Sequence, residues 1–349
     1  MKIYLSSFIA VLLGGVIGGL PVGGVSAQPA AGPAPAPSNV SAPLVLVQRI
    51  AMPNVKGRMD HLGIDIEGKR VFAAALGDDQ NTVEVVDFQS GKRVFSIPGQ
   101  SKPQGVFYSA DFKRLFVSNG DDGTYKIFRG DDLKPINSAP LGINPNHVGY
   151  DPATKYLYVG FRDAASGHLA IVDTETGGHI GDIRTDTQPG GIKIEAAGPR
   201  IFVTLAGASK IGVVDREKRQ QIATWPLAHV VSALALDESR HRLFAGGRNP
   251  AKLVVLDTVS GKQIAELDCV SGIDDLWYDT VRKRIYATGT DGLAVYDQKD
   301  ADHYTPMVKV ASAAGAATSI WVPTLGRLFV SAPQVGNGEA AILVFEAPR

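Results

Sequence analysis

Short apolar stretches alternate with polar turns along the chain, and no window keeps the periodicity of a helix for long. A typical unit has an apolar stretch, an acidic residue, a basic turn and a second apolar stretch with an aromatic residue, as in Phe107–Phe116. This pattern is typical of two antiparallel strands joined by a tight turn. Because a carboxylate can accept hydrogen bonds from turn N–H groups, we expect the recurring acidic residue to cap the turn.

Seven such segments align without gaps at intervals of 42 to 44 residues: 63–72, 107–116, 149–158, 193–202, 235–244, 277–286 and 320–329. Most units continue into a third strand, such as Leu253–Asp257, and a fourth, such as Arg93–Ile97. Four short strands per repeat of this length predict an all-β, seven-bladed β-propeller with four-stranded antiparallel blades.

The last repeat lacks a fourth strand, because the chain ends soon after its third strand, Ala341–Phe345. An apolar stretch at residues 44–50 precedes the first repeat and has no other blade to join. We therefore predict that this N-terminal strand completes the last blade and closes the ring, which also covers an unpaired strand edge. The propeller domain is expected to span residues 44–349.

The repeat resembles that of the YVTN/YncE-like seven-bladed β-propellers, which belong to the WD/YVTN repeat-like superfamily. The resemblance covers nearly all of residues 44–349 and rests on Leu115–Asn119, Tyr156–Gly160 and Leu328–Ser331. The literal tetrapeptide Tyr-Val-Thr-Asn is absent, and Phe202–Leu205 comes near it. The resemblance implies an exported propeller. Some similar propellers carry cofactors or hydrolyse lactones, but the chain contains no motif for either.

The N-terminus has the pattern of a secretory signal. Lys2 is followed by uncharged residues from Ile3 to Val25, and small residues end at Ala27. We predict a signal peptide at residues 1–27 and a Pro/Ala-rich linker at 28–43, hence a periplasmic or secreted protein without membrane contact after cleavage. The alternative is an uncleaved anchor, because the apolar run is nearly long enough to span a bilayer. Its many glycines disfavour a stable anchor helix.

Charge and cysteine content narrow the function classes. The chain has 35 basic and 35 acidic residues, so its net charge is zero, which argues against a general nucleic-acid binder. A single cysteine, Cys269, excludes an intramolecular disulfide. We expect a monomer.

Candidate functional residues are those that interrupt the repeat in the loops at one mouth of the central channel. His61 and His147 hold the same position in blades one and three, and Asp274 and Asp275 lie across the ring. The candidate binding residues are Asp60, His61, Gln104, Asn146, His147, Arg162, Ser232, Arg248, Asp274 and Asp275.

Two functions from different classes fit these residues. The first is a non-catalytic binding or scaffold protein for an unknown small molecule, protein or glycan. The alternative is an enzyme, hydrolase or lactonase-like or metal-assisted, with His61, His147 and Asp275 at the channel mouth. These three could hold a divalent metal, although no spacing motif supports one and no other cofactor is indicated. A local DNA- or glycan-binding face is a third option, and hydrogen bonding to channel water is the purely structural interpretation.

Overall fold

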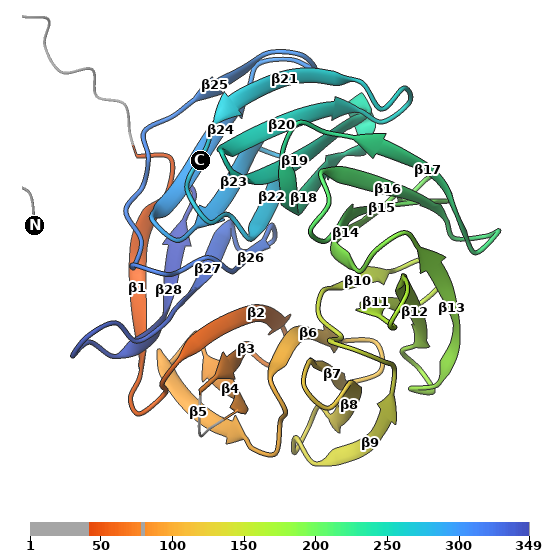
Figure 1. Cartoon of the computed structure of the whole chain (residues 1–349). Helices are drawn as coiled ribbons and strands as arrows, with labels where there is room; N and C mark the ends of the chain where they lie inside the picture. The colour runs from red at the N-terminus through yellow and green to blue at the C-terminus, as the bar shows by residue number, and fades with distance from the viewer. Residues whose placement is uncertain (1–41, 78–80, 349) are drawn as a thin grey trace, which may run out of the picture. The chain divides into compact units, whose positions relative to one another are not determined.

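The computed structural model describes residues 42–77 and 81–348, which form seven four-stranded antiparallel sheets arranged as the blades of a ring (Figure 1). Helix is confined in these ranges to one short turn, η1 (Glu238–Arg240). None of their helical segments has the length and apolar character needed to cross a membrane. The predicted seven-bladed β-propeller is therefore confirmed. The predicted signal peptide and most of the predicted linker lie outside the described residues.

The strands of each blade follow one another from the centre of the ring outward. Blade 1 contains β2 (Arg58–Asp65), β3 (Arg70–Leu76), β4 (Asn81–Asp87) and β5 (Lys92–Ile97); blade 2 contains β6 (Pro103–Ser109), β7 (Arg114–Asn119), β8 (Thr124–Arg129) and β9 (Pro135–Pro140). Blade 3 contains β10 (Val148–Asp151), β11 (Tyr156–Arg162), β12 (Gly167–Asp173) and β13 (His179–Thr185); blade 4 contains β14 (Pro189–Ile194), β15 (Arg200–Leu205), β16 (Lys210–Asp215) and β17 (Gln220–Pro226).

The remaining three blades complete the ring. Blade 5 contains β18 (Val230–Asp237), β19 (Arg242–Asn249), β20 (Ala251–Asp257) and β21 (Gln263–Asp268); blade 6 contains β22 (Asp275–Asp279), β23 (Arg284–Gly289), β24 (Gly292–Gln298) and β25 (Tyr304–Pro306). Blade 7 contains β26 (Ser319–Val322), β27 (Arg327–Ala332), β28 (Ala340–Glu346) and, outermost, β1 (Val45–Met52).

The recurring acidic residues cap the turns between the first two strands of a blade, as predicted. Asp65 accepts a hydrogen bond from the N–H of Gly68 at 2.9 Å. Asp279 accepts from the N–H groups of Val281 and Arg282 at 2.9 and 3.1 Å. These carboxylates therefore serve the fold, because they satisfy turn donors that no strand partner reaches.

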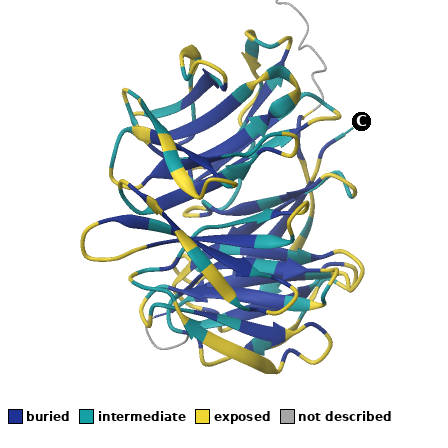
Figure 2. Ribbon diagram, turned by 90° about the vertical axis from the view of Figure 1, so that its right-hand side faces the viewer, coloured by how far each residue is buried: buried dark blue, intermediate teal, exposed yellow. Residues whose placement is uncertain are grey.

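The core lies between neighbouring blades, where the strand faces are buried and the loops at both ends are exposed (Figure 2). The last position of each aligned repeat is aromatic and no more than 2% exposed: Phe72, Phe116, Tyr158, Phe202, Phe244, Tyr286 and Phe329. Each blade thus contributes the same large side chain to the same layer of the core, and this repeated burial explains why the sequence repeat specifies the fold.

The ring is closed by β1, which pairs with β28 from Val45 opposite Glu346 to Met52 opposite Ala340. Ile50 and Met52 are fully buried, and they belong to a core cluster with residues of both blade 7 and blade 1. The prediction that an N-terminal strand completes the last blade is confirmed. The strand ends at residue 52 rather than at residue 50, because Met52 still packs into this cluster.

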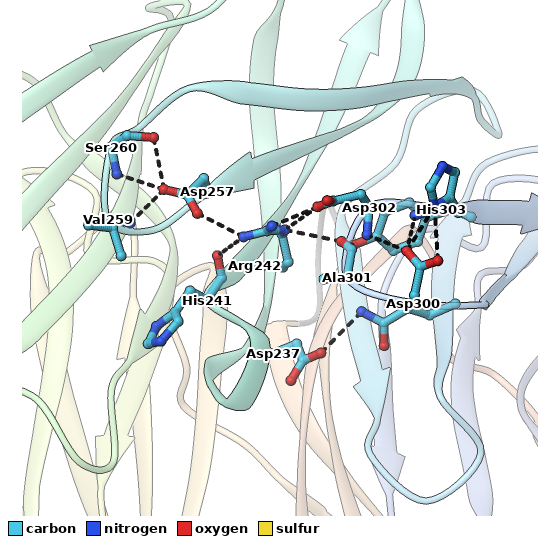
Figure 3. Close-up of polar contacts among 12 residues, drawn as sticks. Asp237, His241, Arg242, Asp257, Val259, Ser260, Asp300, Ala301, Asp302 and His303 are labelled. Carbon is cyan, nitrogen blue, oxygen red and sulfur yellow. Dashed lines mark hydrogen bonds and ion pairs between the residues drawn. The ribbon is translucent and has the colours of Figure 1, made fainter.

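Arg242 at the start of β19 ties blade 5 to the outer loop of blade 6 (Figure 3). Its guanidinium group donates to the carbonyl of Ala301 at 3.0 Å, to Asp302 at 2.6 Å and to Asp257 at 2.8 Å. Its side chain is largely buried. One side chain thus joins three segments of two neighbouring blades.

We expect Arg242→Ala to lower the free energy of unfolding by about 2 kcal/mol, because charge-assisted hydrogen bonds between the two blades are lost together. Urea titration measures this change. Arg240→Ala is the matched control, since among the described residues Arg240 makes a single 3.5 Å side-chain contact, with Asp237. The control is expected to cost less than about 0.5 kcal/mol. Equal losses in the two variants would show that Arg242 does not join the blades energetically.

Candidate functional site

Three candidate side chains from blades that are not neighbours meet across the channel. The ring centroids of His61, in blade 1, and His147, just before blade 3, are 4.4 Å apart, although blade 2 lies between these blades. Nδ1 of His61 lies 3.4 Å from Oδ2 of Asp275, in blade 6. Residues that are far apart in the sequence therefore form one cluster.

A cavity of about 280 Å³ opens beside this cluster, and we call it the channel-mouth cavity. Eight of the ten predicted binding residues line it: Asp60, His61, Gln104, Asn146, His147, Ser232, Arg248 and Asp274. Asp275 does not line it but contacts His61. Further polar lining residues are Arg58, Lys102, Asn144 and Thr204.

A β-bulge in the innermost strand of blade 1 brings two consecutive side chains to the cavity. Met59 pairs with Ala75 and Leu62 pairs with Ala73, so residues 60 and 61 face only residue 74 across the ladder. In a regular strand, neighbouring side chains point to opposite faces, and a bulge breaks this alternation. Both Asp60 and His61 can therefore line the same cavity.

The loop that carries His147 is held by hydrogen bonds from blades 2 and 3. Ser118 donates from its hydroxyl to the carbonyl of Asn146 at 2.7 Å, and the N–H of Gly160 donates to the carbonyl of His147 at 2.9 Å. A Cβ atom on Gly105 would lie 2.2 Å from the Asn146 carbonyl oxygen. Glycine at position 105 thus permits the close approach that places His147 beside His61.

His61 is cationic at neutral pH. Burial alone lowers the pKa of His61, but the nearby carboxylates of Asp275 and Asp60 outweigh it and raise that pKa to about 10. Asp60 also pairs with Arg58, and Asp274 pairs with Arg248. The channel mouth therefore holds positive and negative side chains in pairs, and they stabilise one another where water is partly excluded.

His147 is neutral at neutral pH. Burial lowers the pKa of His147 well below its usual range, and the positive charges of His61, Arg248 and Lys193 lower it further. Its Nε2 atom and Oδ1 of Asn146 are buried without a hydrogen-bond partner in the part of the chain that the structure describes. Unpartnered buried polar atoms are costly, and these two belong to adjacent residues that line the cavity.

A second contact across the channel involves a residue that the sequence did not single out. Nζ of Lys193, in blade 4, lies 4.5 Å from the ring centroid of Trp277, in blade 6. Trp277 donates from its indole N–H to the hydroxyl of Ser319 at 3.1 Å, and the N–H of Ser319 donates to Asp275 at 2.7 Å. This chain of contacts holds the carboxylate that faces His61. Burial lowers the pKa of Lys193, and Asp275 raises it.

The structure does not place all of the candidate residues at the cavity. Arg162 lies at the exposed end of β11, outside the lining of the cavity. Within residues 42–77 and 81–348, no group of three or more His, Cys, Asp or Glu side chains is arranged to hold a metal ion. Metal binding by His61, His147 and Asp275 stays a prediction for metal analysis to test.

Some residues at the site were not predicted from the sequence, and the repeat distinguishes only one of them. Lys193 is the one charged residue at the first position of the seven aligned segments, which otherwise holds Gly63, Phe107, Gly149, Ala235, Trp277 and Ile320. That exception could have marked it. The other polar lining residues do not interrupt the repeat in this way, because polar residues are ordinary in propeller loops and strand ends. These residues are Arg58, Lys102, Asn144 and Thr204.

The opposite pKa shifts of the two histidines predict a pH at which the stability of the protein is greatest. His61 binds its proton more tightly in the folded state, so its contribution is complete below pH about 6.5 and is lost as the pH rises toward about 10. His147 stays neutral when folded, so its contribution is present above pH about 6.5 and is lost as the pH falls. Their combined contribution is therefore greatest near pH 6.5.

Urea titration between pH about 5 and about 9 measures this profile. The double variant His61→Ala/His147→Ala is expected to show a flatter dependence than the wild type. Identical profiles would mean that the two histidines do not have the opposite shifts described above.

Comparisons with known proteins identify the fold alone. No protein-family model matches the chain, and neither does any curated protein sequence. A chain in the crystal structure of a mitotic checkpoint complex superposes with a TM-score of 0.73 at 16% identity, over 95% of this chain and 100% of that one. A chain of Kuenenia stuttgartiensis hydrazine synthase superposes with a TM-score of 0.67 at 14% identity, over 80% of this chain and 95% of that one.

Proposed function

We propose that this chain is an exported propeller of the YVTN/YncE-like kind that binds a small polar ligand at the channel-mouth cavity. One observation carries the proposal. Side chains from separate blades converge on a cavity lined by His147 and Asn146, whose buried Nε2 and Oδ1 atoms have no partner among the described residues. Export is supported by the signal-like residues 1–27.

The walls of the cavity are fixed by contacts between neighbouring blades. The hydroxyl of Thr318, in the loop before β26, donates to the carbonyl of Asp60 at 2.8 Å. The hydroxyl of Ser232 donates to the carbonyl of Ile273 at 2.7 Å, and Nε of Arg248 donates to the same carbonyl at 3.0 Å. A site held in this way loses little conformational entropy when a ligand binds, so it favours binding.

A thermal-shift experiment tests this function with a panel of small sugars, amines, amino acids and organic acids. We expect at least one class to raise the melting temperature of the wild type and to lose this effect in His147→Ala, which removes the unpartnered nitrogen. His303→Ala is the control, because this exposed histidine pairs with Asp300 in an outer loop, away from the cavity. If no compound binds, or if binding survives His147→Ala unchanged, the proposed function is wrong.

A second candidate function is acid–base catalysis at the same site. It is favoured by the two adjacent histidines, one cationic and one neutral, whose pKa values are driven apart by their surroundings. Such a separation is how enzymes assign a general acid and a general base. Hydrolysis of dihydrocoumarin by the wild type, and its loss in His61→Ala and in His147→Ala, would support a lactonase-like activity. Metal analysis of the wild type then shows whether a metal assists.

A further inference from the structure

The charged residues around the channel-mouth cavity leave a positive excess. Its lining contains Arg58, Lys102, Arg248 and the protonated His61, against the carboxylates of Asp60 and Asp274. One positive charge remains in excess when three further charged residues near the lining, Asp121, Asp275 and Lys193, are included. Burial also raises the pKa of Asp274. The cavity is therefore suited to a negatively charged occupant.

The two arginines at the cavity have donors left over for such an occupant. Among the described residues, Arg58 pairs only with Asp60, and Arg248 uses its Nε on the carbonyl of Ile273 and one terminal nitrogen on Asp274. Arg58 is also close enough to Asp274 to feel its charge, which places the two ion pairs near each other. Planar guanidinium groups bind carboxylate and phosphate oxygens with paired hydrogen bonds.

Burial is the main cause of the neutral state of His147, and an excess of nearby positive charge adds to it. His147 is surrounded by cations and carboxylates. The cations are Arg58, His61, Lys193 and Arg248. The carboxylates, which face His61 and these cations, are Asp60, Asp274 and Asp275. The cations outweigh the carboxylates at His147 itself. A bound anion would offset this excess of positive charge, and its oxygen would give Nε2 the partner it lacks.

We propose that the ligand of the channel-mouth cavity is a small oxyanion, whose carboxylate or phosphate group lies among Arg58, Arg248 and His147. This inference rests on the binding function proposed above and names its ligand class. The cavity volume of about 280 Å³ is below the range of pockets for drug-sized ligands, so the anion has only a few carbon atoms. The polar side chains of Asn144, Gln104 and Thr204 line the rest of the cavity and fit its hydroxyl or carbonyl groups.

Isothermal titration calorimetry on the full chain at low ionic strength tests the proposal with three probes. Succinate is the carboxylate, succinamide is its uncharged isostere, and inorganic phosphate is the alternative oxyanion. We expect succinate or phosphate to bind and succinamide not to bind. Which of the two anions binds more tightly assigns the source of the oxyanion. We also expect uptake of a proton by His147, seen as a dependence of the measured heat on the buffer.

Arg58→Gln and Arg248→Gln are each expected to weaken anion binding about tenfold, which corresponds to about 1.4 kcal/mol. Arg58 is largely exposed, so its variant is expected to fold normally even if Arg248→Gln does not. Arg162→Gln is the matched control, because this exposed arginine lies outside the cavity, and it is expected to leave affinity unchanged.

Two results would overturn the inference. The first is that neither anion binds, or that both bind equally well to the arginine variants and the wild type. The second is that succinamide binds as tightly as succinate. Either result leaves the proposed function standing if an uncharged compound of the panel binds in a way that His147→Ala abolishes, so the two failures are distinguishable.

Discussion

Removal of residues 44–52 is expected to abolish the cooperative unfolding transition of the ring. Without β1, the outer edge of β28 has no partner, and the cluster shared by blades 7 and 1 loses the fully buried Ile50 and Met52. The cost of losing two such side chains alone is several kcal/mol, which approaches the whole stability of an ordinary domain. Circular dichroism during heating measures the transition.

Two controls separate ring closure from simple shortening of the chain. Removal of residues 28–41, which the sequence predicts to be linker, is expected to leave the melting temperature unchanged. Within β1, Ile50→Ala is expected to cost about 3 kcal/mol, whereas Leu46→Ala, at a position that is 51% exposed, is expected to cost less than about 1 kcal/mol. Equal melting temperatures for the two truncations would contradict closure by β1.

Replacement of His61 by alanine is expected to lower the free energy of unfolding by about 3 kcal/mol. Asp60 is buried and Asp275 is largely buried, and both lose the cation that stands between them. Removal of one partner from a buried ion pair leaves an uncompensated charge, which costs more than the pair itself contributes. Urea titration at neutral pH measures the loss.

Neutralisation of Asp275 is expected to restore part of the stability that His61→Ala removes. The double variant His61→Ala/Asp275→Asn is expected to be more stable than His61→Ala alone, because asparagine keeps an acceptor for the N–H of Ser319 and carries no charge. His147→Ala is expected to cost less than His61→Ala, since the neutral His147 balances no buried charge. If Asp275→Asn lowers stability further in the His61→Ala background, His61 is not the counter-ion of Asp275.

The fold could be predicted from the sequence because every blade repeats the same packing. The aromatic residue that ends each aligned segment is buried in all seven blades, and the acidic residue after the first strand caps its turn. The closure by β1 could also be predicted, from the strand missing in the last repeat. The exact end of β1 could not, because the burial of Met52 depends on the neighbouring blade.

The candidate site could be predicted only in part. His61 and His147 were found because equal positions in a repeat lie at equal heights in a ring, and the structure places their rings together. Lys193 was missed because a lysine in a strand is ordinarily exposed, whereas here it crosses the channel to Trp277. The direction of Arg162 depends on where β11 ends, which the pattern of apolar residues does not determine to the residue.

A crystal structure of the full chain grown with succinate, and with phosphate in a parallel crystal, is the decisive test of oxyanion binding at the channel mouth. We expect an anion in the channel-mouth cavity, with its oxygens in contact with Arg58, Arg248 and Nε2 of His147. A cavity that holds only water in both crystals, with the anions absent or bound elsewhere on the ring, would contradict it.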